Sequence, residues 1–197
     1  MRLYCATSNP GKLREFRLAL GPVRLLPLPG LKDLPQFEET GATFEANAMA
    51  KALYYSAYAP GLLFAEDSGL EVEALGGAPG VRSARFAGEG ATDEANNRLL
   101  LEKLRGVSDR RARFVCVVAL AEKGRLLATF RGAVEGRILE APRGHYGFGY
   151  DPVFYYPPFR ATFAQVAPAR KFSVSHRGQA LRGLLTWLRR FSSQSGG

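Results

Sequence analysis

The sequence predicts an α/β fold built on a mixed β-sheet. Its 197 residues are 46% hydrophobic and 23% charged, proportions typical of a globular protein with a substantial core. Segments with apolar residues at helical spacing alternate with strand-like apolar runs, and both hairpins and longer crossovers connect them. Parallel and antiparallel pairs are therefore expected in one sheet. We expect a single domain over residues 1–191 and a polar, disordered tail at 192–197.

The first segments are predicted to form a strand, a helix and an edge strand. Residues 2–7 ("RLYCAT") are apolar and strand-like. Residues 11–20 repeat apolar side chains at helical spacing, and Pro22 should stop that helix. Prolines interrupt residues 23–31, and a strand that lacks some N–H donors belongs at the edge of a sheet.

A long helix and two strands are predicted next. Thr43 is a suitable N-cap for a helix over 43–59, which a proline-glycine pair closes. Residues 62–66 form an apolar run that ends in Glu66, and residues 70–75 alternate in polarity, so each is predicted to be a strand. The polar stretch "DSG" at 67–69 lies between them, and a solvent-facing turn is the simplest interpretation of it.

The second half of the chain is predicted to complete the sheet and its helical cover. A glycine-rich loop is expected at 76–80, followed by a helix at 93–104 that Thr92 caps. Residues 112–139 should form two strands, joined by a turn at Lys123-Gly124, and a further extended piece. A second glycine-rich loop is expected at 144–154, and a last helix at 176–191.

Composition excludes several classes of protein. No apolar stretch approaches the ~20 residues of a transmembrane helix, and the N-terminal apolar run is too short for a signal peptide. We therefore expect a cytoplasmic protein. Cys5 and Cys116 each lie in an apolar, strand-like segment, so buried free thiols are expected. The chain has no CxxC motif, which makes a zinc site improbable.

The formal net charge of +9 suits a protein that attracts small polyanions such as nucleotides. A nucleic-acid binder would also be basic. The arginines, however, are scattered and form no long block or aromatic-interleaved stripe. A solvated basic surface accounts for most of them in either case.

The first two of four polar clusters could hold phosphates and a metal. "TSNPGK" at 7–12 joins a strand to a helix, where free N–H groups and a lysine make an anion cradle; an ordinary helix cap is the alternative. Glu38 and Glu39 precede the helix that carries Lys51. Carboxylates near a phosphate usually serve a metal, and Mg²⁺ commonly uses one or two of them. Exposed acids in a loop are the structural alternative.

The third cluster is "AEDSG" at 65–69. Glu66 and Asp67 are predicted to end a buried strand, the position at which α/β folds place ligands. Adjacent strand residues point to opposite faces of a sheet, so the two acids should not share one role. The hydroxyl of Ser68 could hold a phosphate oxygen.

The fourth cluster combines an aromatic loop with donors near the last helix. Phe148 lies between glycines and could stack on a base. The alternative for Phe148 and Tyr150 is loop-anchoring core packing, and for His176 a capping or packing role. The polar members of the cluster are Asp151, Lys171, His176 and Arg177.

In this order, "TSNPGK", "FEETGATFEANA", "AEDSGLEVEALGGAPGVRSARF", "GFGYDPVF" and "SHRGQAL" resemble the inosine triphosphate pyrophosphatase family over Thr7 to Leu181. The resemblance implies an elongated mixed sheet with flanking helices, two lobes around a central cleft, and a homodimer. It also implies hydrolysis of ITP, dITP and XTP to the monophosphate and pyrophosphate, by Mg²⁺-assisted attack of water on the α-phosphorus.

The same resemblance assigns roles to individual residues. Asp67 becomes the catalytic acid and a metal ligand, with Glu39, or its neighbour Glu38, as the second metal-site acid. The triphosphate would be held by Thr7, Ser8, Asn9, Lys12, Lys51 and Ser68. The nucleoside would be held by Phe148, Gly149, Tyr150 and Asp151, and the base by Lys171, His176 and Arg177. Because arginine only donates hydrogen bonds, Arg177 suits a 6-oxo purine and not the 6-amino group of adenine.

The chain departs from the family pattern at three positions. Many bacterial members have an aspartate where this chain has Glu66, a glycine is more usual at Ser8, and a glutamate often stands at Ala46. None of these changes removes a donor or acceptor that the mechanism needs.

Three other functions fit parts of the pattern. A pyrophosphatase acting on modified pyrimidine nucleotides is the nearest enzymatic alternative. A non-catalytic nucleotide-binding protein would keep the lysines without needing Asp67. A single-stranded nucleic-acid binder would use the net charge and Phe148, and its affinity would fall steeply with salt. The expected partner is a small-molecule nucleoside triphosphate, with no nucleic acid and no membrane.

Overall fold

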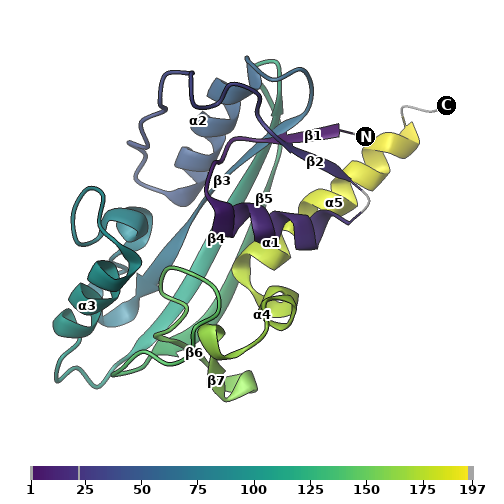
Figure 1. The fold of residues 1–197 in the computed structure, drawn as a ribbon. Helices are drawn as coiled ribbons and strands as arrows, with labels where there is room; N and C mark the ends of the chain where they lie inside the picture. Colours follow the sequence, from purple (N-terminus) through teal and green to yellow (C-terminus); the bar gives the residue numbers. More distant parts are fainter. Residues whose placement is uncertain (1, 22, 195–197) are drawn as a thin grey trace.

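The computed structural model describes residues 2–21 and 23–194, which form a mixed sheet flanked by helices (Figure 1). The sheet order is β2-β1-β3-β4-β5-β6-β7. Its strands are β1 (Arg2–Cys5), β2 (Arg24–Pro27), β3 (Leu63–Val72), β4 (Arg111–Glu122), β5 (Arg125–Ile138), β6 (Phe154–Tyr156) and β7 (Ala161–Thr162). β1 pairs in parallel with β2 and β3, and all later pairs are antiparallel. The predicted α/β class with a mixed sheet is confirmed.

Two of the helices begin directly after the N-caps that the sequence predicts. The helices are α1 (Pro10–Leu20), α2 (Phe44–Ser56), α3 (Asp93–Lys103), α4 (Pro168–Val174) and α5 (His176–Gln194). Thr43 accepts a hydrogen bond from the Ala46 N–H at 3.1 Å, and Thr92 accepts one from the Ala95 N–H at 3.2 Å. These contacts satisfy N–H groups that the first turn of a helix leaves without an internal partner.

The sheet separates two apolar layers. Leu63 and Ala65 of β3 pack with α2, whereas Phe64 packs with α1 and α5 on the opposite face. This alternation is what the period of two along a strand requires. A third cluster, which includes Leu100 of α3 and Phe154 of β6, lies at the other end of the long strands. Figure 1 shows β3, β4 and β5 running between these two ends.

One local prediction is wrong. Residues 62–66 and 70–75 do not form two strands around a turn, because β3 runs without interruption from Leu63 to Val72. Asp67, Ser68 and Gly69 pair in register with residues of β4. Only glycine fits at position 69 of this strand, because a Cβ there would lie 2.3 Å from Ser83 Oγ. The two acids therefore lie in the middle of a strand and not at its end.

Other boundaries differ by a few residues. The region 112–139 forms one hairpin, with no separate extended piece after β5. α4 was not expected from the sequence, and α2 ends at Ser56. α5 continues to Gln194, so the start of the expected tail is helical. Pro22, expected to stop α1, and the last residues of the tail, 195–197, lie outside the described residues.

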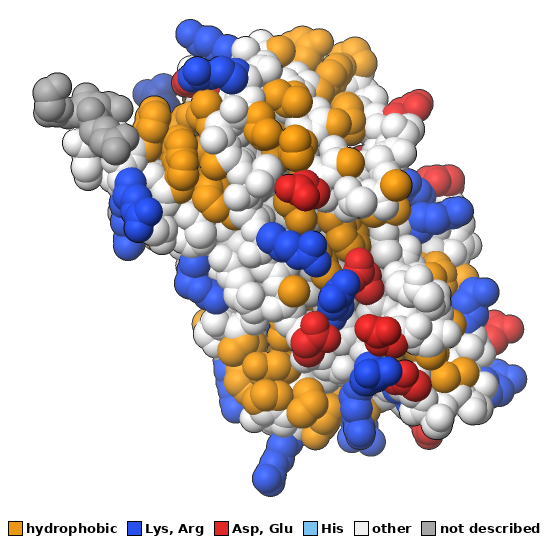
Figure 2. All heavy atoms as spheres, turned by 180° about the vertical axis from the view of Figure 1, so that it is seen from behind, with side chains coloured by type: hydrophobic (Ala, Val, Ile, Leu, Met, Phe, Trp, Pro, Cys, Tyr) orange, Lys and Arg blue, Asp and Glu red, His pale blue; other side chains and the backbone are white. Residues whose placement is uncertain are grey.

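Cys5 and Cys116 are both buried and free, as predicted. Within the described part of the chain, no helix is long and apolar enough to cross a membrane. Figure 2 shows that basic and acidic side chains are interspersed on the face seen from behind, with hydrophobic patches between them. Neither sign of charge forms a continuous block on that face.

Candidate active site

Glu66 and Asp67 are neighbours on β3 that contact opposite layers. Glu66 forms an ion pair with Lys12 of α1, and its Oε2 lies 3.5 Å from Arg177 Nε of α5. Asp67 faces the other way, and its Oδ2 accepts a hydrogen bond from Asn47 Nδ2 of α2 at 2.9 Å. The prediction that the two acids lie on opposite faces is confirmed.

Asp67 is held in an environment that disfavours its charge. It is only 5% exposed, although the Ser68 N–H donates to its Oδ1 at 2.9 Å. Burial, together with the charges of Glu39 and Glu66, raises its pKa to about 6 against the opposing hydrogen bond from Asn47. Mutual repulsion among carboxylates is relieved by a cation bound between them.

The charged groups facing Asp67 include the carboxylate of Glu39, and carboxylate oxygens are the kind of ligand that Mg²⁺ takes. Among the described residues, no group of three or more His, Cys, Asp or Glu side chains is arranged to hold an ion. Mg²⁺ keeps several waters and uses one or two carboxylates with substrate phosphates, so two acids suffice for it. The charge of Glu39 helps to raise the pKa of Asp67, and Glu39 also forms an ion pair with Lys51. Glu38, by contrast, is exposed.

A hollow of about 780 Å³ opens beside these acids. Of the predicted site residues, it is lined by Thr7, Ser8, Glu38, Glu39 and Lys51. It reaches the loop before α1, where Asn9 caps the helix by accepting from the Lys12 N–H at 3.1 Å. A helix N-terminus and a lysine together favour an anion here.

A second hollow of about 290 Å³ borders the other end of that loop. Its predicted lining residues are Asn9, Lys12, Ser68, Phe148, Gly149, Tyr150, Asp151, Lys171, His176 and Arg177. The loop at residues 7–12 thus borders both hollows, with Thr7 and Ser8 at the first and Asn9 and Lys12 at the second. Asp67 is not among the residues described as lining either hollow, but its neighbour Ser68 borders the second.

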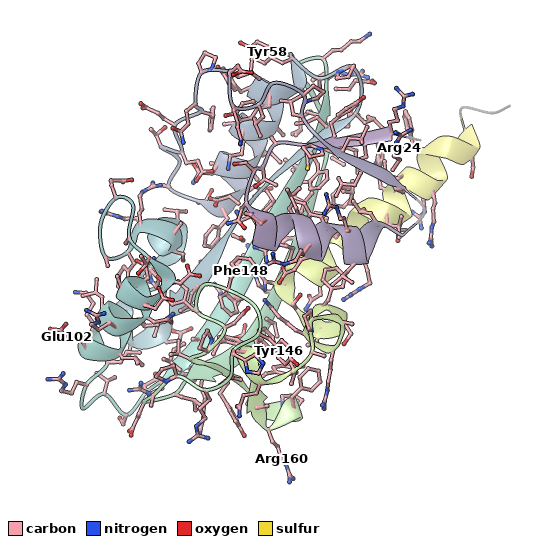
Figure 3. All side chains as sticks on the ribbon, in the orientation of Figure 1. Arg24, Tyr58, Glu102, Tyr146, Phe148 and Arg160 are labelled. Carbon is pink, nitrogen blue, oxygen red and sulfur yellow. The ribbon has the colours of Figure 1, made fainter. Side chains whose placement is uncertain are left out.

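Phe148 packs between the start of α1 and two buried cations. Lys171 Nζ and Arg177 Cζ lie 5.2 and 5.5 Å from its ring centroid, within the range of cation–π attraction. A Cβ at Gly11 would lie 2.8 Å from the ring, so glycine is needed for this approach. Figure 3 shows Phe148 at the part of its loop that faces α1, with Tyr146 further along the same loop.

Buried ion pairs hold the cations of the second hollow. Lys171 Nζ lies 2.8 Å from Glu15 Oε1 and 2.5 Å from Asp151 Oδ2. Arg177 donates to Glu15 through Nη1 and to Ser68 Oγ through Nη2, the latter at 2.8 Å. Burial alone would raise the pKa of Glu15, but the charges of Arg177 and Lys171 lower it to about 2.

The surroundings of His176 disfavour a positive charge on its ring. Burial, with the charges of Arg177 and Lys171, holds its pKa well below the usual range. Its ring stacks on Phe114 at a centroid distance of 4.7 Å. Nδ1 is buried and has no hydrogen-bond partner among the described residues, which is costly unless a ligand supplies one.

Two other predicted residues shape the site from within. The hydroxyl of Tyr150 donates to the Ser83 carbonyl at 2.8 Å, and Asp151 Oδ2 accepts from the Phe148 N–H at 3.0 Å. Both side chains are buried. The hydrogen bond of Tyr150 supports the loop-anchoring interpretation for that residue, and its side chain borders the hollow together with Phe148.

Asn47 and Glu15 were missed at the sequence level, although each left a signal. Asn47 lies at the end of the first turn of an alanine-rich helix, where asparagine is a poor helix former and needs another reason to be present. Glu15 lies three residues after Lys12 and therefore on the same side of α1, next to the apolar stripe. The buried position of Glu15 and the hydrogen bond from Asn47 to Asp67 are those reasons.

The chain has close relatives among known proteins. A sequence model of the Ham1 family matches residues 3–187. A dITP/XTP pyrophosphatase of Acidobacterium capsulatum is 50% identical over 95% of this chain and 98% of its own length, and one of Thermus thermophilus is 50% identical over 94% and 90%. The solved Ham1 protein of Staphylococcus aureus is 40% identical with a TM-score of 0.86, and the HAM1 protein of Coxiella burnetii is 41% identical with a TM-score of 0.87. They cover 96% of this chain and, respectively, 98% and 99% of their own chains.

Proposed function

This chain belongs to the Ham1 family and hydrolyses noncanonical purine nucleotides, and we propose that water attacks the α-phosphorus of ITP, dITP or XTP and releases pyrophosphate. The observation that carries this proposal is that the loop at residues 7–12 borders two hollows of different chemistry. One hollow has acids and a lysine for a metal-bound triphosphate. The other has an aromatic ring and buried donors for a base.

The first hollow and the start of α1 would bind the triphosphate. Thr7, Ser8 and Asn9 supply hydroxyl, amide and backbone N–H groups at a helix N-terminus, which attracts anions. Lys12, Lys51 and Ser68 would add donors on either side. The positive charges of Lys12 and Lys51 would stabilise the transition state, in which negative charge gathers on phosphate oxygens.

Asp67 and Glu39 would hold Mg²⁺, with Glu38 as the weaker candidate because it is exposed. The fit rests on the repulsion that Glu39 and Glu66 exert on the buried Asp67 carboxylate. When bound, the ion supplies positive charge that offsets the charge of the phosphates. Lys51, paired with Glu39, would orient that carboxylate.

Asp67 would also accept the proton of the attacking water. A general base works best when its pKa lies near the working pH, and burial brings the pKa of Asp67 to about 6 without a cation. The hydrogen bonds from Asn47 and from the Ser68 N–H fix the orientation of its carboxylate.

The second hollow would select the base. Phe148 would stack on the purine, while Lys171, His176 and Arg177 would read its edge. Arg177 uses two of its N–H groups on Glu15 and Ser68, which leaves others for a 6-oxo group. Adenine would present an amino group there and leave these donors unpaired, which is how a polar site rejects the wrong base by ~10⁴-fold.

We further propose a cytoplasmic homodimer. Support comes from the hydrophobic patches visible in Figure 2 and from exposed large side chains such as Leu18 and Tyr58, since large apolar surface often marks an interface. Light scattering after size-exclusion chromatography measures the mass directly. A monomer at micromolar concentration would contradict the proposal.

The reaction is tested by product analysis with ITP, dITP, XTP, ATP, GTP and dUTP, each with and without Mg²⁺. We expect ITP to yield IMP and pyrophosphate only when the metal is present. Release of single phosphates would move the attack to the γ-phosphorus and contradict the proposal. Preferential hydrolysis of dUTP would instead favour a pyrimidine-directed enzyme.

Phe148→Ala is expected to raise the KM for ITP by about 5- to 150-fold with little change in kcat, because stacking on an aromatic ring contributes ~1–3 kcal/mol per base. Steady-state kinetics measure both constants. Tyr146→Ala is the matched control, since Tyr146 is an exposed ring on the same loop. Equal KM values for the two variants would show that Phe148 only packs the loop.

A further inference from the structure

The loop that carries Phe148 is fastened from outside by α3. The Gly149 N–H donates to Asp93 Oδ2 at 2.6 Å, and Asn97 Nδ2 donates to the Gly149 carbonyl at 2.9 Å. Two side chains one helical turn apart therefore bind both polar groups of a single residue. These contacts join parts of the chain that are more than 50 positions apart in sequence.

Each member of this contact is itself held in place. Asn97 Nδ2 also donates to the Asp93 carbonyl at 2.9 Å, which fixes the orientation of the amide. Asp93 lies in the first turn of α3, where the helix dipole favours a negative charge. Gly149 has a φ of 64°, a left-handed conformation that glycine adopts without strain.

Gly149 directly follows Phe148, so its peptide groups control where the ring lies. On the inner side, Asp151 accepts from the Phe148 N–H and pairs with Lys171. On the outer side, Asp93 is the only acceptor described for the Gly149 N–H. Asp93 also borders the second hollow together with Phe148. Losing the α3 contacts would free one side of the loop while leaving the buried ion pairs intact.

We propose that Asp93 and Asn97 are positioning residues, which fix the loop so that Phe148 is preorganised to stack on the base. This inference rests on the proposed function and assigns α3 a part in base recognition. Preorganisation improves affinity by removing the cost of ordering a loop on binding. The effect should therefore fall on nucleoside binding and leave the phosphate end unchanged.

The test compares Asp93→Ala with Glu94→Ala, which removes an equal charge from the same helical turn at an exposed position. Asp93→Ala is expected to raise the KM for ITP about 10-fold, because it removes a hydrogen bond to a charged group. Its kcat should stay within about 2-fold of the wild-type value. Asp93→Asn, which keeps an acceptor oxygen, should recover most of the affinity. Because Asp93 is exposed, the variant should fold, and a thermal melt checks this.

Two further measurements separate positioning from other roles. The inhibition constant of inorganic tripolyphosphate, which lacks a base, should stay unchanged in Asp93→Ala. In a Phe148→Ala background, Asp93→Ala should add less than about 2-fold to KM, because residues that act through one another are not additive.

The inference is overturned if Asp93→Ala and Glu94→Ala give the same KM, if tripolyphosphate binding weakens as much as ITP binding, or if the effect persists in full without Phe148. Failure of the proposed function would appear differently, as absence of IMP and pyrophosphate from the wild-type reaction with ITP.

Discussion

Asp67→Asn is expected to lower kcat for ITP by about 10²- to 10⁴-fold, the usual contribution of a general base, while nucleotide binding stays measurable. An amide cannot accept the proton of water at neutral pH, and it is a weaker ligand for Mg²⁺ than a carboxylate. Pyrophosphate release measures the rate, and calorimetric titration with ITP and Mg²⁺ measures binding. A variant with a normal rate would show that Asp67 is neither base nor metal ligand.

Thermal unfolding of the metal-free proteins provides the control for folding. The pKa of Asp67 is about 6 in the folded protein, above its ordinary value, so the folded state binds this proton more tightly than the unfolded chain. The stability of the wild type relative to Asp67→Asn is therefore expected to increase as the pH is lowered from 7 to 5. If the relative stability of the wild type instead decreased as the pH was lowered, the folded protein would stabilise the charged form of Asp67.

Lys171→Met is expected to lower the free energy of unfolding by about 3–5 kcal/mol, the usual result of removing one partner from a buried ion pair, and to abolish ITP hydrolysis. The ammonium lies between Glu15 and Asp151, and all three side chains are almost fully buried. Without it, Asp151 loses the cation with which it pairs, and Glu15 keeps only Arg177. Urea denaturation measures the loss.

Arg170→Met is the matched control for Lys171→Met. Arg170 is the preceding residue on α4 but is exposed, with its guanidinium 4.4 Å from the Phe159 ring centroid. An exposed cation–π contact contributes only about 0.5–1 kcal/mol. Adding Asp151→Asn to Lys171→Met should restore part of the lost stability, since Lys171 is the only cation described as pairing with that carboxylate. Equal stability of the Lys171 and Arg170 variants would contradict the role given to the buried pairs.

Local signals predicted local structure well. Thr43 and Thr92 were identified as caps because capping depends on residues within one helical turn. β2 was placed at an edge because prolines remove N–H donors. The break in β3 was predicted wrongly for a related reason. "DSG" has the composition of a turn, but pairing with β4 and the contacts of Asp67 with Asn47 override that preference.

The site was predictable in its residue types and much less in its contacts. The five motifs point to the residues that line both hollows, because each motif is contiguous in the chain. The pairing of Lys171 with Glu15 spans 156 positions, and that of Gly149 with Asp93 spans 56. Neither pairing has a periodic or compositional signal, so only the folded chain reveals it.

Glu66 pairs with Lys12 on one side and with Arg177 on the other. A single carboxylate therefore contacts one cation proposed to bind the triphosphate and one proposed to bind the base. A substitution at Arg177 intended to broaden base choice would therefore also alter the charge balance at Lys12, and changes at the two cations should combine non-additively. Variants selected for a new nucleotide would then need compensating mutations at or around this glutamate, so the order in which mutations accumulate would limit which preferences the enzyme can reach.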